Sequence, residues 1–497
     1  MSTHLPAYEA LLAHLRQTEA LEQVSEILSW DQETMMPPKG APFRAEQMAA
    51  LGATLHRRQT DPALADLLDA LDGADLDPVA ARNVAEARRD AARAARLPQR
   101  LVEELAREAA LAQQVWADAR DASDFKQFAP ALSRIVDLKR EESACLTDEG
   151  TDRYDALLDA FEPGMKTDRL AALLGSVRPG LVALREVIAA APPLPVSPPV
   201  KLGADAQMQL ARRMAEAAGY DFEAGRIDLV LHPFCLGSAG DARITTRVSE
   251  TNPFDCLYST LHETGHALYT QGQDPALAFM PAGNHAGMGA HESQSRLLEN
   301  QIGRSAAYAD WLAGEIETVT GRAVEGGATA LYQQLNTVAP GFIRTEADEV
   351  HYNLHVLMRF DLERALIAGD LAVADLEAAW NDRFLADFGV TVPDAARGVL
   401  QDIHWSAGLF GYFPTYSLGN IYAANLFDAL KRARPALEDE IRRGQLSGAL
   451  DWLRTHVHRR GRLVPADRIV ADACGAEADG ARLTDYLSAK FGALYGL

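Results

Sequence analysis

The chain has 497 residues, of which 48% are hydrophobic and 24% are charged, and its formal net charge is −22 at pH 7. A chain of this length can bury a large core, and the composition is that of a water-soluble globular protein. The excess of negative charge disfavours nucleic acid and anionic membrane surfaces as partners, because it would repel their phosphates. The four cysteines form no C-x-x-C pair, and no window holds the roughly 18 uncharged apolar residues of a membrane span. Since the N-terminus also has no basic segment followed by an apolar run, we expect a cytoplasmic protein.

Apolar residues recur at three- and four-residue spacing up to residue 190, for example in residues 8–28 and 98–120, and this predicts long helices. The proline-rich segment 191–203 cannot be helical, because proline removes a donor and clashes with the preceding turn, so we expect a surface connection. Residues 226–250 alternate in short runs broken by Gly and Pro, which predicts a small antiparallel sheet of two or three strands. Helical spacing returns from about residue 254 to the end, so the predicted fold class is mainly α.

A metal-binding pattern follows the predicted sheet, in STLHETGHALYTQ, residues 259–271. On a helix, His262 and His266 would lie on one face and could point two imidazole nitrogens at one ion. Glu263 lies about 100° round that helix, where it could touch a water on the ion as general base. Gly265 costs about 1 kcal/mol relative to Ala inside a helix, which suggests that something approaches closely there. The segment therefore has the H-E-x-x-H signature of zinc hydrolases.

A third ligand is needed to leave one position of the ion open for water. Residues 291–303, HESQSRLLENQIG, read as a second helix on which Glu292 and Glu299 share a face. Either could be the ligand while the other accepts a hydrogen bond from a ligand imidazole, and the spacing does not choose between them. Asp274, His285 and His291 also lie downstream of the H-E-x-x-H segment. A carboxylate is favoured over His285 or His291 as the third ligand, because residues 280–289 look like a loop.

Two further histidine pairs occur in the chain. His351 and His355 are also four residues apart, but Tyr352 stands where a general base would be, so we expect histidines packed beside a functional helix. His456 and His458 alternate with arginines, which predicts a solvated basic face.

At this point the sequence resembles the M32 carboxypeptidases, the thermostable carboxypeptidase Taq group of metallopeptidases. The likeness covers essentially the whole chain, and six motifs stand in the family's order: HPF from His232 to Phe234, DARIT from Asp241 to Thr245, HETGH from His262 to His266, HESQ from His291 to Gln294, IRTEAD from Ile343 to Asp348, and GVLQDIHW from Gly398 to Trp405. One departure is His351, where a smaller polar residue would be expected before YNLH.

The resemblance implies that Glu292 is the third zinc ligand, with Glu299 and His291 as candidates for supporting the ligands from behind. It also implies a single peptidase domain over 1–497, with two helical lobes flanking a deep groove similar to that of neurolysin, and commonly a homodimer. The metal and substrate-binding core would then span 254–423. One Zn²⁺ per chain is expected, and Co²⁺ could substitute for it.

The expected function is a zinc-dependent carboxypeptidase of broad specificity, in which Glu263 takes the proton of the attacking water. A second donor to the oxyanion is needed, and the candidates are His404 and Tyr416, each of which could instead be a packed side chain. An oligopeptidase cutting internally is the alternative enzyme, and a non-catalytic helical scaffold with a structural metal is the alternative from another class.

A carboxypeptidase must also recognise a free carboxylate, which arginine does with two parallel donors. Arg344 is favoured for this role over Arg243, which would shape the groove and limit substrate length. Either arginine could instead form a structural ion pair, with Asp348 or Asp241. His232 and Asp241, both in family motifs, complete the expected substrate-binding set.

Overall fold

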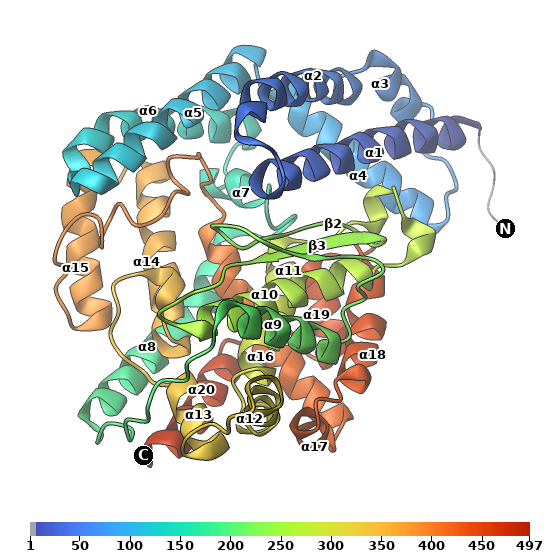
Figure 1. Ribbon diagram of the computed structural model, residues 1–497. Coiled ribbons are helices and arrows are strands. Elements are labelled where there is room, and N and C mark those ends of the chain that lie inside the picture. The colour runs from blue at the N-terminus through green and yellow to red at the C-terminus, as the bar shows by residue number, and fades with distance from the viewer. Residues whose placement is uncertain (1–5) are drawn as a thin grey trace.

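Helices make up most of the chain, as the apolar spacing predicted, and the computed structural model describes residues 6–497 (Figure 1). Asp61 and Asp77 each cap a helix by accepting a backbone N–H bond, and proline follows both caps. Residues 191–203 form no helix or strand, which confirms the predicted connection. The helices before the sheet are α1 (Pro6–Thr34), α2 (Ala41–Gln59), α3 (Pro62–Asp69), α4 (Pro78–Arg96), α5 (Gln99–Ala122), α6 (Phe125–Leu146), α7 (Arg153–Leu158), α8 (Thr167–Ala190) and α9 (Ala204–Ala218).

The small sheet has three strands, β1 (Ile227–Leu229), β2 (Cys235–Ser238) and β3 (Asp241–Thr246), in the order β1-β3-β2. The predicted antiparallel pairing is right for β2 and β3 but wrong for β1, which pairs with β3 in parallel, so the sheet is mixed. The tight hairpin between β2 and β3 fixes these two strands antiparallel, and β1 takes the open edge of β3. Gly237 in β2 has φ 113°, and a Cβ there would lie 1.9 Å from the Asp241 carbonyl oxygen, so only glycine fits.

The second half of the chain is again helical. Residues 297–302 form a π-helical turn directly after α11, labelled η4. The helices are α10 (Pro253–Gln271), α11 (Met288–Arg296), α12 (Ala306–Thr320), α13 (Gly327–Leu335), α14 (Glu349–Ala368), α15 (Leu376–Phe388), α16 (Phe413–Ala433), α17 (Leu437–Arg442), α18 (Ser447–His456), α19 (Ala466–Cys474) and α20 (Ala481–Tyr495). Among residues 6–497, none of the helices is long and apolar enough to cross a membrane.

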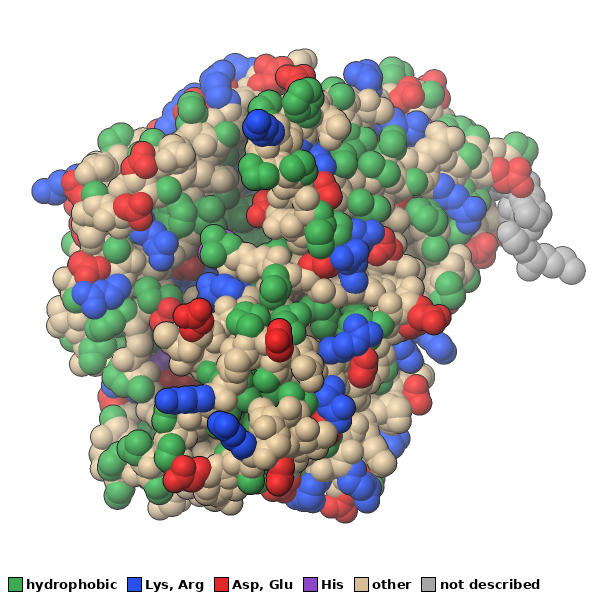
Figure 2. Space-filling view, in the orientation of Figure 1, with side chains coloured by type: hydrophobic (Ala, Val, Ile, Leu, Met, Phe, Trp, Pro, Cys, Tyr) green, Lys and Arg blue, Asp and Glu red, His purple; other side chains and the backbone are tan. Residues whose placement is uncertain are grey.

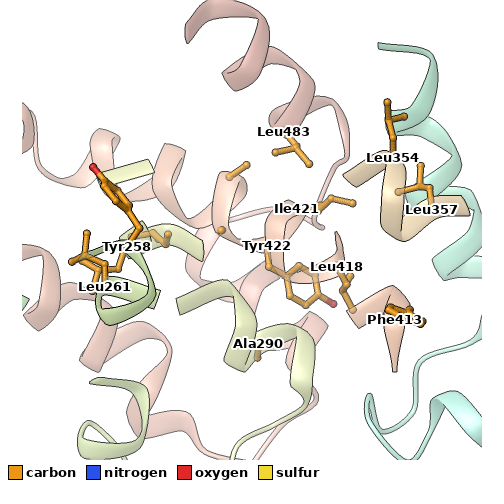
Figure 3. Close-up of a cluster of buried hydrophobic side chains, with 14 of the residues drawn as sticks. Tyr258, Leu261, Ala290, Leu354, Leu357, Phe413, Leu418, Ile421, Tyr422 and Leu483 are labelled. Atoms are coloured by element: carbon orange, nitrogen blue, oxygen red, sulfur yellow. The ribbon is translucent and has the colours of Figure 1, made fainter. Parts of the chain in front are cut away.

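The main core surrounds α10, α11, α14 and α16, which are buried along most of their length. Figure 3 shows side chains of these helices together, with Tyr258 and Leu261 from α10, Ala290 from α11 and Leu418 from α16. A separate small core joins α1, α3 and α4 through Leu11, Leu64 and Val84, among others. The elements around α10 are therefore held rigidly, as a reaction centre requires.

A cavity of about 520 Å³ lies between α1, β2, α10 and the segment before α11. Figure 2 shows the surface hollowed beside the N-terminal helices, near the top of the view. Glu22 and Glu26 of α1 line this cavity, and burial raises the pKa of each carboxyl to about 7. Near neutral pH both carboxyls are therefore partly protonated, and the cavity is less negative than its residue types suggest.

Candidate active site

The helix α10 carries the H-E-x-x-H residues deep in the core. Asn252 caps it by accepting a hydrogen bond from the backbone N–H of Phe254, and Pro253 stands at its first position. The imidazole rings of His262 and His266 lie 4.9 Å apart, centroid to centroid, on one face. A Cβ at Gly265 would be 2.5 Å from the backbone of Gln294, so the glycine lets α11 touch α10 backbone to backbone. The close approach inferred from Gly265 is thus made by α11, the helix of Glu292.

Three side chains meet at this contact. The Oε2 atom of Glu292 lies 3.6 Å from Nε2 of His262 and 3.3 Å from Nε2 of His266, and the three donor atoms all lie within 4.8 Å of one another. Atoms about 2.0–2.1 Å from one tetrahedral ion are separated by about 3.3 Å, so this geometry fits a single divalent cation. Within the described part of the chain, no other group of three His, Cys, Asp or Glu side chains is placed to hold a metal.

Both imidazoles are oriented from behind. The Nδ1 atom of His262 is 2.9 Å from Oε2 of Glu299, and that of His266 is 2.5 Å from Nδ1 of His291. A proton on Nδ1 of both His262 and His266 leaves the Nε2 lone pairs facing Glu292. Burial lowers the pKa of His291 well below its usual value, so His291 is neutral and can accept this bond.

Arg296 at the end of α11 connects the carboxylates of Glu292 in α11 and Glu299 in η4. Its Nε atom donates to Oε1 of Glu292 at 2.7 Å and its Nη1 atom to Oε2 of Glu299 at 2.9 Å. Burial by itself would raise the pKa of both carboxyls, but Arg296 and the histidines outweigh it. The pKa of Glu292 falls well below its usual value and that of Glu299 falls to about 2. Both acids are therefore ionised, with Glu292 facing the imidazoles and Glu299 behind His262.

Glu263 lies beside the cluster without belonging to it. Only 7% of this residue is exposed, and burial raises the pKa of its carboxyl, although His262 and His266 oppose the shift. A buried carboxylate next to an ion site can take a proton more readily than one in water.

Arg344, favoured for binding a substrate carboxylate, is 5% exposed and pairs with Asp402 rather than with Asp348. Asp402 Oδ1 accepts from Nε and Nη2 of Arg344 at 3.1 and 3.0 Å, and its Oδ2 accepts from Nε of Arg359 at 2.7 Å. The Nη1 atom of Arg344 donates to the Tyr352 hydroxyl at 3.1 Å. Two buried guanidinium groups thus share one carboxylate, which leaves one positive charge in excess.

His404 and Tyr416 lie next to this group. The Tyr416 hydroxyl is 3.1 Å from Nε2 of His404, and the centroid of the Tyr416 ring is 4.8 Å from the guanidinium carbon of Arg344. Burial lowers the pKa of His404 to about 3, so the imidazole is neutral. Burial likewise raises the pKa of Tyr416 well above its usual value, so its hydroxyl keeps its proton and can donate a hydrogen bond.

The remaining motif residues lie at the sheet. Arg243 forms two hydrogen bonds to Asp241, at 2.8 and 2.7 Å, and lies 4.3 Å from the ring centroid of Trp30 in α1. The structural ion pair considered for Arg243 is therefore present. His232 is exposed on the connection between β1 and β2 and is not part of the metal cluster.

The pair His351 and His355 is buried, as predicted, whereas in the other pair His458 is buried and His456 is half-buried. His351 and His355 pack against Phe388, with ring centroids 5.8 and 4.4 Å away. The predicted solvated face is wrong for His458, which is fully buried with Nε2 2.9 Å from Oε1 of Gln294. The ring of His458, just after α18, lies 5.3 Å from that of Tyr269 in α10, centroid to centroid, and bonds to Gln294 of α11. The local sequence HVHRRGR does not reveal these contacts.

Sequence reasoning assigned no role to Arg296, Tyr352 or Asp402. Arg296 could have been found, because it lies four residues after Glu292 and three before Glu299 on one helix. Tyr352 and Asp402 meet Arg344 only through the tertiary fold. Asp402 lies in the motif GVLQDIHW, but nothing in that motif points to Arg344.

The family of the chain follows from its matches to known proteins. The profile of the carboxypeptidase Taq (M32) metallopeptidases matches residues 10–491. The chain belongs to the M32 family. Thermostable carboxypeptidase 1 of Thermus thermophilus is 39% identical over 507 aligned residues, covering 99% of both chains. The crystal structure of the M32 carboxypeptidase of Deinococcus radiodurans superposes with a TM-score of 0.95 at 36% identity, over 99% of this chain and 100% of that one. Trypanosoma cruzi metallocarboxypeptidase 1 gives a TM-score of 0.95 at 32% identity, over 98% and 99%. The protein is therefore a metallocarboxypeptidase, a hydrolase of peptide bonds.

Proposed function

We propose that the protein is a zinc-dependent carboxypeptidase that releases C-terminal residues one at a time with broad side-chain specificity. The observation that carries the proposal is the meeting of His262, His266 and Glu292 beside the buried carboxyl of Glu263. Two nitrogen donors and one oxygen donor are a set typical of catalytic zinc, and Co²⁺ could replace it. When bound there, one such ion per chain would supply Lewis acidity to a water and to the substrate carbonyl.

Glu263 is the proposed general base. Its carboxylate takes a proton from the attacking water and passes it to the leaving amine nitrogen, while Glu299 and His291 keep the imidazoles in one tautomer. A structural metal site needs no base beside it, so Glu263 also argues against a non-catalytic scaffold. In Glu263→Gln, metal content should stay the same while turnover falls by about 10² to 10⁴ or more. Loss of the metal in this variant would contradict the assigned role.

The substrate carboxylate is proposed to bind at Arg344. The excess positive charge of Arg344 and Arg359 over Asp402, in a buried place, favours an anion. The Tyr416 hydroxyl and His404 lie close enough to Arg344 to donate to the same carboxylate or to the oxyanion. In this scheme Arg243, held by Asp241 on β3, shapes the groove with His232 and limits substrate length.

A matched pair of peptides tests this scheme. One peptide has a free C-terminus and its twin is amidated, and the two are incubated with the protein while released residues are identified. We expect rapid release of single residues from the free acid and at least tenfold slower cleavage of the amide. Equal cleavage of both, or fragments from internal cuts, would instead support the oligopeptidase alternative. Arg344→Lys should lower the preference for the free acid, whereas Arg243→Lys should change it less.

The proposal also covers the localisation, oligomeric state and domain organisation of the enzyme. We place it in the cytoplasm as a homodimer, with residues 1–497 forming one peptidase domain whose core spans 254–423. Sedimentation velocity of the purified chain, at several concentrations, tests the oligomeric state directly.

A further inference from the structure

Tyr352 of α14 touches both halves of the active site, although nothing in its sequence context assigned it a role. The guanidinium carbon of Arg296 lies 4.1 Å from the centroid of its ring, and its hydroxyl accepts a hydrogen bond from Nη1 of Arg344 at 3.1 Å. The residue is only 6% exposed, so neither contact is made across solvent. One rigid aromatic side chain thus joins the arginine behind the metal cluster to the arginine proposed to hold the substrate carboxylate.

The metal side of this connection is tightly fixed. Arg296 donates to Glu292 at 2.7 Å and to Glu299 at 2.9 Å, so its position follows that of the metal-binding carboxylate. A guanidinium over an aromatic face is attracted by the ring quadrupole, more strongly where water is excluded. The ring of Tyr352 therefore keeps a fixed position relative to Glu292.

The substrate side is fixed by the same residue. Asp402 holds Nε and Nη2 of Arg344, while the Tyr352 hydroxyl holds Nη1, so the plane of the guanidinium has partners on two edges. Without the hydroxyl, Arg344 could pivot about its bonds to Asp402. The distance from the Arg344 guanidinium to the group of His262, His266 and Glu292 would then vary.

That distance decides which bond is cut. A carboxypeptidase cleaves the last peptide bond of its substrate, which lies one residue from the terminal carboxylate. An arginine that holds this carboxylate selects that bond only if it stands at a fixed separation from the reacting centre. We propose that Tyr352 is a positioning residue that sets this separation and so restricts cleavage to the last peptide bond. The inference rests on the proposed function, because it takes Arg344 as the carboxylate-binding group.

The variant Tyr352→Phe tests the proposal, because it keeps the ring under Arg296 and removes only the hydroxyl. We expect metal affinity within twofold of wild type, since the cluster and Arg296 are untouched. The KM for free-acid peptides should rise at least tenfold with a smaller change in kcat. The ratio of free-acid to amidated cleavage should fall at least tenfold, with some release of dipeptides.

Tyr258→Phe is the matched control. Tyr258 of α10 is also buried, has Arg304 4.3 Å from its ring centroid, and donates its hydroxyl to the Gly303 carbonyl oxygen at 2.7 Å. Tyr258→Phe should lower the thermal midpoint about as much as Tyr352→Phe, but the ratio of free-acid to amidated cleavage should stay at the wild-type value.

Three results would overturn the proposal: an unchanged cleavage ratio in Tyr352→Phe, an equal loss on free-acid and amidated peptides, or a tenfold loss of metal affinity. The wild-type enzyme separates this failure from that of the proposed function. If wild type itself does not prefer the free acid, the role of Arg344 is wrong and the function fails first. If wild type shows the preference and Tyr352→Phe keeps it, only the positioning role fails.

Discussion

Replacing Gly265 by alanine should separate α10 and α11, the two helices that bring His262, His266 and Glu292 together. The added Cβ would lie 2.5 Å from the carbonyl oxygen of Gln294 and from Cα of Ser295, both backbone atoms that cannot rotate away. Ordinary contact begins near 3.4 Å, so α10 and α11 must move apart by about 0.9 Å. Metal sites tolerate changes of only about 0.2 Å in ligand distance. We therefore expect Gly265→Ala to bind zinc at least tenfold more weakly, about 1.4 kcal/mol.

The same substitution also tests stability. Overpacking costs about 1–3 kcal/mol, whereas alanine in place of glycine gains about 1 kcal/mol of helix propensity, so the metal-free variant should be destabilised by up to about 2 kcal/mol. Gly314 of α12 is the control, since a Cβ there meets no atom within 4 Å. Gly314→Ala should be stabilised by about 0.5–1 kcal/mol. The assays are zinc titration against a competing chelator and thermal unfolding. Wild-type zinc affinity and stability in Gly265→Ala would refute the argument.

Three further outcomes are expected. Glu299→Gln should lower metal affinity by about 10- to 100-fold in the same titration, because His262 loses its charged partner; unchanged affinity would contradict this role. Glu162 is 2% exposed and accepts the N–H of Gly289, and burial raises its pKa to about 8. The folded state therefore binds more protons than the unfolded state between about pH 4.5 and 8, and stability falls as pH rises through that window. Glu162→Gln should remove this loss, so it should be more stable than wild type by a few kcal/mol, on the order of 3–5, at pH 9 and similar at pH 5 in chemical denaturation. Removing the metal with a chelator should abolish peptide release and lower the thermal midpoint, and adding zinc or cobalt should restore both.

The extent of helix and the position of the sheet could be predicted from residue spacing alone. Periodicity identified the helices, and the proline-rich segment 191–203 marked the connection, because these depend on local chemistry. The parallel pairing of β1 with β3 could not be predicted, because strand order depends on which edge is open in the folded sheet. The same holds for His458, whose sequence neighbours are charged but whose ring is enclosed by other helices.

Within the candidate site, spacing placed His262 and His266 on one face but left Glu292 and Glu299 equivalent. The resemblance to the family favoured Glu292, and the fold turns Glu292 toward both imidazoles and Glu299 to the far side of His262. The partner of Arg344 was missed. Asp348 lies close to it in sequence, but Asp348 caps α14, and the carboxylate that reaches Arg344 comes from Asp402.

The π-helical turn over Leu297–Ile302 limits how this part of the chain can change in evolution. Such a turn bonds each N–H to the carbonyl five residues back, one residue more than in an α-helix. A deletion of one residue between Glu292 and Glu299 would therefore either close this wide turn or, with the turn kept, rotate one acid by about 100° relative to the other, and both outcomes change where Glu299 lies. Homologous enzymes should therefore keep the length of this segment constant, whereas the connection 191–203 can lengthen or shorten freely.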